Sequence, residues 1–183
     1  VSETQNEHES CLEKYGLTPA QILDVYHVWD ARSVAAHCVW LSEEDMELFA
    51  RRGVSVAHCP NSNLKLASGI APVRKMLDKG LNVALGTDGV SSSNNGDLFE
   101  AVKLAALLSN GSTRDPMSLT AFEALKLATV NGAKAQGRET ECGMIAPGLD
   151  ADLIMLDFTQ PHLIPCHNPV SNLVYAASGH DGG

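Results

Sequence analysis

The chain has 183 residues, of which 44% are hydrophobic and 19% are charged, a composition typical of soluble globular proteins. Thirteen basic residues against 22 acidic residues give a formal net charge of −9. This charge argues against binding to nucleic acids or to anionic membrane surfaces, because phosphate groups are bound by clusters of Lys and Arg. The aromatic fraction of 5% also leaves few side chains on which nucleic-acid bases could stack.

The cysteine pattern and the absence of a long apolar stretch indicate a cytoplasmic protein. The five cysteines are odd in number, widely spaced and form no CxxC motif, which favours reduced thiols. No apolar stretch approaches the roughly 18 residues that a membrane span requires. The first residue is Val1 rather than Met, so we expect the chain to be part of a longer protein.

Helix-like and strand-like segments alternate along the first 138 residues. Pro and capping residues open several of the helix-like segments, and Gly53 and Gly80 close two of them. The pattern predicts helices over residues 7–15, 20–26, 42–50, 73–79, 98–108 and 119–130, strands over residues 34–36, 54–57 and 83–85, and loops over residues 61–70 and 91–96.

The spacing of the strands predicts an α/β fold. Strands that lie about 20 to 30 residues apart, with helices between them, form parallel βαβ units with right-handed connections. After about residue 137 the pattern changes to a turn-rich segment, followed by a strand predicted over residues 151–157 and by no clear helix. We therefore expect one α/β unit over residues 1–138 and part of a small β domain over residues 139–183.

Polar residues follow each predicted strand. His37 follows the strand at 34–36, His58 follows the strand at 54–57, and Asp88 follows the strand at 83–85. At the start of the chain, Val1-Ser2 leads to Glu3 in the same way. Because active sites of α/β folds gather at the carboxyl ends of parallel strands, these residues are candidates for one site.

Each of these residues also has a purely structural interpretation. A single His can be a satisfied core residue, Glu3 can be a surface acid, and Asp88 can cap the segment that follows it. A buried charge at Asp88 would need either such bonding or a cation. His37, Cys38, His58 and Cys59 could form a structural zinc site, but neighbouring residues of a strand point to opposite faces. The coincidence of four polar strand ends favours a functional site.

Five segments occur in a characteristic order: VSETQNE, AAHCVWLSEED, VAHCPNSNLKLASGIAPV, NVALGTDG followed by SNN, and GMIAPGLDADLIMLD. In order and spacing they resemble the amidohydrolase superfamily, and most closely its methylthioadenosine/S-adenosylhomocysteine deaminases and triazine hydrolases. The resemblance covers nearly the whole chain. It implies a (β/α)₈ TIM-type barrel, of which this chain holds the C-terminal half, followed by part of a small β-sandwich. It also implies one divalent metal ion, Zn²⁺ or alternatively Fe²⁺.

The resemblance assigns roles to three residues. Asp88 matches the metal-binding Asp, which also takes a proton from the attacking water. Glu3 matches the Glu of an HxxE motif, which protonates the substrate ring, and His37 matches a catalytic His that hydrogen-bonds the attacking oxygen. Glu3 and His37 would both contact the substrate. The other metal ligands, an HxH pair and the His of HxxE, would lie before Val1.

His58 and Asn63 lie in the long HCPNSN block, where the resemblance gives His58 no direct metal role. We expect both side chains to support the catalytic residues rather than to bind the metal.

The expected function of the intact protein is hydrolytic deamination of adenosine-like nucleosides, with a small molecule as the only partner. One alternative is another amidohydrolase substrate, such as a triazine, another purine or pyrimidine, or a cyclic amide. The second alternative concerns this chain by itself. Half a barrel exposes unpaired strand edges, so the chain would be inactive, would hold no metal and would self-associate.

Overall fold

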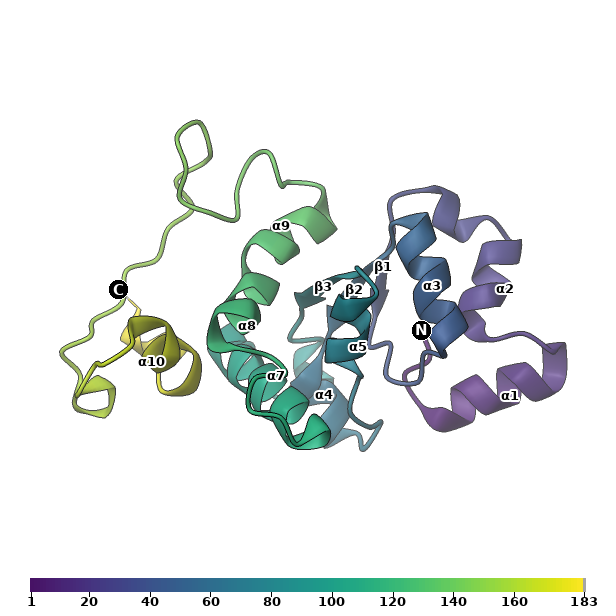
Figure 1. Ribbon diagram of the computed structural model, residues 1–183, viewed down its shortest axis with the longest axis horizontal. Helices are drawn as coiled ribbons and strands as arrows, with labels where there is room; N and C mark the ends of the chain where they lie inside the picture. The colour runs from purple at the N-terminus through teal and green to yellow at the C-terminus, as the bar shows by residue number, and fades with distance from the viewer. Residues whose placement is uncertain (183) are drawn as a thin grey trace.

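The centre of the molecule is a parallel sheet of three short strands, in a computed structural model that describes residues 1–182 (Figure 1). The strands are β1 (Val34–Ala36), β2 (Ser55–His58) and β3 (Asn82–Leu85), and their order in the sheet follows their order in the chain. Val1 runs beside β1, since its amino group donates to the Ala36 carbonyl (3.0 Å) and its carbonyl accepts from the Cys38 amide (3.1 Å). Glu3 is thereby brought to the carboxyl edge of this sheet.

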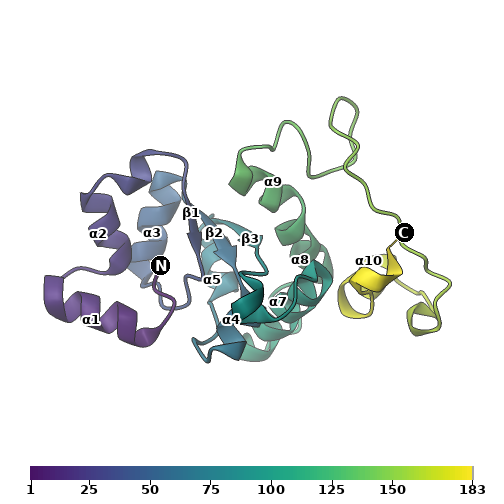
Figure 2. The same ribbon diagram turned by 180° about the vertical axis from the view of Figure 1, so that it is seen from behind.

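Helices cover the sheet from two sides. Figures 1 and 2 show α1–α3 on the side of the sheet where β1 lies and α7–α9 on the side where β3 lies, with α10 beyond α7–α9. The helices are α1 (Gln5–Tyr15), α2 (Pro19–Val25), α3 (Glu43–Arg52), α4 (Pro60–Lys65), α5 (Val73–Asp78), α6 (Val90–Ser93), α7 (Leu98–Thr113), α8 (Ala121–Ala128), α9 (Val130–Gln136) and α10 (Pro169–Tyr175). Among residues 1–182 there is no helix with the length and apolar character of a membrane span.

Local sequence explains where α3 begins and ends. The Ser42 hydroxyl accepts from the amide of Asp45 (3.1 Å) and the Asp45 carboxylate accepts from the amide of Ser42 (3.1 Å), which is a reciprocal capping box. Gly53 ends the helix with a φ of 68°, a conformation that costs other residues steric strain. Met46 and Phe49 on the buried side of α3 belong to the hydrophobic core.

The hydrophobic core lies between the sheet and its helices. Val56 and Val83 are fully buried strand residues, and Phe49 of α3 packs edge-on against Trp29 with ring centroids 5.0 Å apart. The Trp29 ring nitrogen donates to the Ala20 carbonyl (2.8 Å), so its polar atom is satisfied inside the core. The parallel pairing of β1 with β2, in which Ala36 lies opposite Ala57, places the ends of the two strands side by side.

The predicted α/β architecture is confirmed, but two helical segments differ from the prediction. Residues 61–70 were predicted as a loop, whereas residues 60–65 form α4, which starts at Pro60 with the fixed φ that suits a first helical turn. The helix predicted over residues 119–130 is two helices, α8 and α9, that meet at Thr129 (φ −118°, ψ −98°). Part of the loop predicted over residues 91–96 belongs to the short helix α6.

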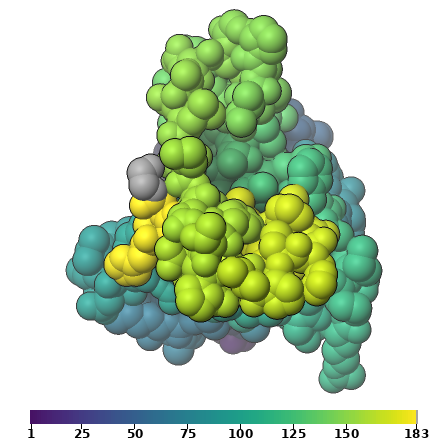
Figure 3. Space-filling view, turned by 90° about the vertical axis from the view of Figure 1, so that its left-hand side faces the viewer, coloured from purple at the N-terminus to yellow at the C-terminus, as the bar shows by residue number. Residues whose placement is uncertain are grey.

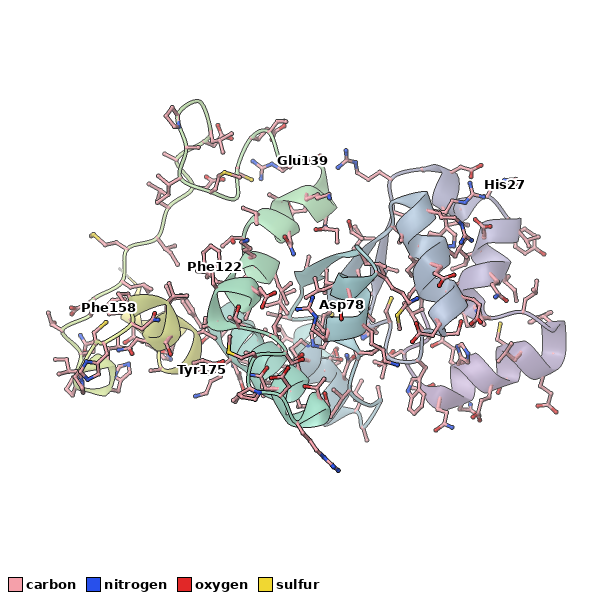
Figure 4. The ribbon with its side chains drawn as sticks, viewed as in Figure 1. His27, Asp78, Phe122, Glu139, Phe158 and Tyr175 are labelled. Carbon is pink, nitrogen blue, oxygen red and sulfur yellow. The ribbon has the colours of Figure 1, made fainter. Side chains whose placement is uncertain are left out.

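The C-terminal segment also differs from the prediction. The strand predicted over residues 151–157 is wrong: only Leu156 pairs, through an isolated antiparallel bridge to Gly182. A strand needs a hydrogen-bonding neighbour along its length. Within residues 1–182 this run has only the single bridge at Leu156, and Ile154 and Met155 are 73% and 77% exposed. The structure places helix α10 in a region where no helix was expected. Figure 3 shows this segment, in green to yellow, on the surface of one side of the molecule, and in Figure 4 Phe158 lies there, far from His27.

Candidate active site

The structure brings Glu3 and His37 together at the carboxyl edge of the sheet. Glu3 Oε2 lies 3.8 Å from His37 Nε2, and both side chains are largely shielded, with 29% and 15% exposure. Ser68 donates its hydroxyl to Glu3 Oε1 (3.1 Å), which leaves the other carboxylate oxygen facing His37. The predicted proximity of these two strand ends is therefore seen in the structure.

The backbone turns sharply at His37. His37 and Cys38 have φ values of 69° and 53°, so two successive residues adopt the left-handed conformation that non-glycine residues rarely occupy. The His37 amide still donates to the Ala57 carbonyl (3.0 Å), which ties the turn to β2. On the other side of the ring, His37 Nδ1 lies 2.9 Å from Asn63 Oδ1. The turn and the Asn63 contact together direct Nε2 towards Glu3.

Asp88 is held by three hydrogen bonds at the end of the β3 segment. Its Oδ2 accepts from the hydroxyls of Ser62 (2.7 Å) and Ser92 (2.8 Å), and its Oδ1 accepts from the Gly89 amide (2.7 Å). The Ser62 hydroxyl, then the Gly89 amide and the Ser92 hydroxyl, lower the pKa of Asp88 to about 2. The carboxylate is therefore ionised at neutral pH.

The expectation that the charge of Asp88 is buried at the end of a strand is wrong. The residue is exposed, so its charge keeps contact with solvent and does not depend on a cation. Asp88 does not cap α6, because the N-cap residue is Gly89 and no side chain caps this helix; Asp88 bonds to the Gly89 amide and to the hydroxyl of Ser92. These bonds are compatible with metal binding, since a carboxylate has about four lone-pair directions and the bonds to Asp88 use three.

Asp88 fits a divalent metal ion as one ligand among several. It offers an ionised, oriented carboxylate at the sheet edge, and carboxylate oxygen is an ordinary zinc ligand. Within residues 1–182, however, no three His, Cys, Asp or Glu side chains lie close enough together to hold an ion. The described residues therefore do not form a complete metal site by themselves.

The two cysteines that follow the strands do not offer thiolate ligands. Burial raises the pKa of Cys38 to about 12, and burial, followed by the charge of Asp88, raises the pKa of Cys59 to about 11. Both thiols are therefore protonated at neutral pH when no metal is bound. The alternative of a structural zinc site built from His37, Cys38, His58 and Cys59 has no support in the described residues.

His58, the last residue of β2, is fully buried, and its Nδ1 has no hydrogen-bond partner among the described residues. Burial, followed by the charge of the neighbouring His37, lowers the pKa of His58 to about 4. The ring is therefore neutral at physiological pH. This location next to His37 agrees with the expectation that His58 supports the site rather than binds the metal, a role that stays a prediction.

The buried His58 predicts a specific loss of stability in acid. Its pKa is depressed on folding, so between about pH 6.5 and pH 4 the unfolded chain binds a proton that the folded chain excludes. The free energy of unfolding is expected to fall by up to about 3 kcal/mol across that window, since each pKa unit corresponds to about 1.4 kcal/mol. Urea unfolding at pH 7 and pH 4.5 measures the fall, and His58→Gln should reduce it. An equal fall in both proteins would contradict the assignment.

Three serines hold the candidate catalytic carboxylates, a role that the sequence does not assign to them. Ser62 and Ser92 bond Asp88, and Ser68 bonds Glu3. Serine is common in turns and caps, so its type alone carries no signal. The only hint was the position of Ser62 and Ser68 within the same long block that contains Asn63 and follows the second strand.

The acidic and imidazole side chains lie at the carboxyl edge of parallel strands, which is where the active sites of α/β enzymes gather. The family model described as Amidohydrolase family matches residues 1–179. The chain therefore belongs to the amidohydrolase family, and the resemblance noted in the sequence is confirmed.

Two named relatives match almost the whole chain. A 5'-deoxyadenosine deaminase from Methanothermobacter thermautotrophicus is 48% identical over 181 residues, and a 5-methylthioadenosine/S-adenosylhomocysteine deaminase from Moorella thermoacetica is 49% identical over 181 residues. Each match covers 99% of this chain and 42% of the relative. The chain thus spans less than half the length of these relatives.

Solved structures match the fold as well. An adenosine deaminase from Xanthomonas campestris with bound zinc is 38% identical, with a TM-score of 0.95, over 100% of this chain and 42% of that chain. The atrazine chlorohydrolase TrzN from Arthrobacter aurescens TC1, complexed with zinc, is 30% identical, with a TM-score of 0.87, over 96% of this chain and 38% of that chain. Both of these neighbours carry zinc.

Proposed function

We propose that the whole protein hydrolytically deaminates adenosine-like nucleosides. The observation that carries this proposal is the convergence of Glu3 and His37, 3.8 Å apart, on the sheet edge that also presents the oriented carboxylate of Asp88. The names of the two relatives, a 5'-deoxyadenosine deaminase and a methylthioadenosine/S-adenosylhomocysteine deaminase, support the substrate class. The net charge of −9 supports a small-molecule substrate rather than a nucleic acid.

The same proposal includes the larger architecture. We infer that residues 1–138 form the C-terminal half of a (β/α)₈ barrel and that the residues after 138 belong to a small β-sandwich. The TM-score of 0.95 against a structure of which the chain covers 42% supports the partial barrel. A full barrel needs about 250 residues, more than the first 138 supply.

A divalent ion, Zn²⁺ first and Fe²⁺ as the alternative, would be held by Asp88 together with ligands from outside residues 1–182. When bound, it would supply Lewis-acid chemistry that lowers the pKa of a water molecule from about 15.7 towards 7. The zinc in both neighbouring structures supports this choice. Asp88 would accept the proton of the attacking water, and its bonds to Ser62 and Ser92 would keep it oriented for that transfer.

His37 and Glu3 would act on the two sides of the substrate carbon that bears the amine. His37 would hydrogen-bond the attacking oxygen through Nε2, the nitrogen that Asn63 does not contact, and would stabilise its charge. Glu3 would protonate the ring nitrogen and assist the departure of ammonia. Its bond from Ser68 would fix one carboxylate oxygen and leave the other for the substrate.

Ammonia release tests the substrate class. We would replace the matched segment of the Methanothermobacter relative by this chain and assay the zinc-loaded chimaera with 5'-deoxyadenosine, methylthioadenosine, S-adenosylhomocysteine and an aminotriazine. Turnover of the nucleosides above that of the triazine is expected. Turnover of the triazine alone would favour the second candidate, a triazine hydrolase, which the similarity to the atrazine chlorohydrolase supports. An active parent relative with an inactive chimaera would contradict both.

For the 183-residue chain by itself we propose self-association and no catalysis. Val34 of the edge strand β1 is 48% exposed, and Ile145 and Met155 of the C-terminal segment are 87% and 77% exposed. Apolar surface of this kind is buried favourably against a second copy. Sedimentation velocity is expected to show a dimer or larger species whose share grows with concentration. A monodisperse monomer over the whole concentration range would contradict this prediction.

A further inference from the structure

Two neighbouring residues of α4 hold the two candidate catalytic side chains that lie on either side of β2. Ser62 donates to Asp88 (2.7 Å) and Asn63 contacts His37 (2.9 Å). Successive side chains of a helix point about 100° apart, so adjacent residues can reach two different directions. Because α4 directly follows the central strand β2, one direction leads to the end of β3 and the other to the end of β1.

The helix itself is firmly anchored. Ser62 and Asn63 are buried, with 0% and 1% exposure. The Asn63 amide donates to the Cys59 carbonyl (3.0 Å), and the Asn63 carbonyl accepts from the Ser68 amide (2.8 Å). Asn63 is thereby tied at its backbone to the end of β2 and to the residue that bonds Glu3.

Asn63 is an unusual residue for such a position if its role is structural. Its Nδ2 is buried without a hydrogen-bond partner among the described residues, and an unsatisfied buried donor destabilises the fold. An apolar side chain of similar size would avoid that cost. What Asn63 provides at this position is Oδ1, which is 2.9 Å from His37 Nδ1 and can only accept a hydrogen bond.

We propose that α4 is the positioning element of the site, in which Ser62 orients Asp88 and Asn63 keeps the proton of His37 on Nδ1. Protons then enter and leave the His37 ring only through Nε2, the nitrogen that faces Glu3. Asp88 would take one proton of the attacking water, and the other proton of that water would be hydrogen-bonded to Nε2 of neutral His37. Transfer of this second proton onto Nε2 would let the ring donate back to the negative oxygen. This inference rests on the proposed function for the role of His37, but not for its tautomer.

The tautomer is measured directly by nitrogen NMR of the 183-residue chain labelled at histidine, with His37 assigned through His37→Gln. Neutral His37 is expected to carry its proton on Nδ1. Asn63→Asp keeps an acceptor at that place and should retain this tautomer, whereas Asn63→Leu removes the acceptor and should shift the signal towards Nε2–H. A wild-type ring with its proton on Nε2, or an unchanged tautomer in Asn63→Leu with a retained circular dichroism spectrum, would overturn the inference.

Kinetics of the zinc-loaded chimaera test the second half of the inference. Ser62→Ala and Asn63→Leu are expected to lower kcat about 10- to 100-fold, the usual effect of losing a partner that orients a catalytic group, with KM changed far less. Leu64→Ala, on the exposed face of the same helix, is the matched control and should leave kcat unchanged. Equal losses in the control, or no loss in Ser62→Ala, would overturn the positioning role. An inactive chimaera with the expected tautomer would reject the proposed function while leaving the Asn63 assignment supported.

Discussion

Replacement of Asp88 by Asn is expected to abolish deamination by the zinc-loaded chimaera. Asn keeps the size of the side chain but removes the negative charge that the Ser62 hydroxyl, the Gly89 amide and the Ser92 hydroxyl stabilise. An amide is a weaker metal ligand than a carboxylate and cannot take a proton from water. Both consequences act on the same step, so we expect turnover to fall below detection.

The experiment measures ammonia release and bound zinc in the same samples of the Asp88→Asn chimaera. Asp78→Asn is the matched control, because Asp78 is an exposed carboxylate on α5 that pairs with Arg74 (2.7 Å) away from the sheet edge. The control should keep full turnover and full zinc content. Near-native turnover in Asp88→Asn would remove Asp88 from the mechanism, and full zinc content without turnover would restrict its role to proton transfer.

Replacement of Glu3 by Gln is expected to slow turnover at least about 100-fold if proton transfer limits the rate. Gln retains an oxygen that can accept the Ser68 hydroxyl, so the local structure should persist. It has no acidic proton to give to the substrate ring, however. The loss should therefore appear in kcat, with the zinc content unchanged.

Glu13→Gln provides the control for this prediction, because Glu13 is an exposed residue of α1 away from the sheet edge. Steady-state kinetics with a nucleoside that the chimaera deaminates would compare the two variants. An unchanged rate in Glu3→Gln would show that another group protonates the substrate. Equal losses in both variants would point to a general effect of charge removal.

The apolar runs of the sequence were sufficient to predict the sheet. Val56 and Val83 lie in short apolar runs that follow Gly53 and precede Gly86, and both residues are fully buried in parallel strands. Polar residues directly after such runs are expected to meet at one edge of the sheet, and Glu3 and His37 do lie together there.

The supporting contacts could not be predicted in this way. The NSN run of α4 has no apolar periodicity, so the sequence predicts neither the helix nor the different directions of Ser62 and Asn63. The exposure of Asp88 was missed for a related reason, since it depends on the tertiary position of α6 rather than on the strand before it. The run at residues 151–157 has strand-forming residues, but a strand also depends on a neighbour that local sequence does not reveal.

The left-handed backbone at His37, Cys38 and Asp88 has a consequence for engineering. Glycine adopts these φ values without steric cost, so exchanges to glycine would relax the turns that aim His37 and Asp88. A glycine enriched at position 37 or 88 in a screen for thermal resistance alone would also remove a side chain of the candidate site. A screen of this protein therefore has to score turnover together with heat tolerance.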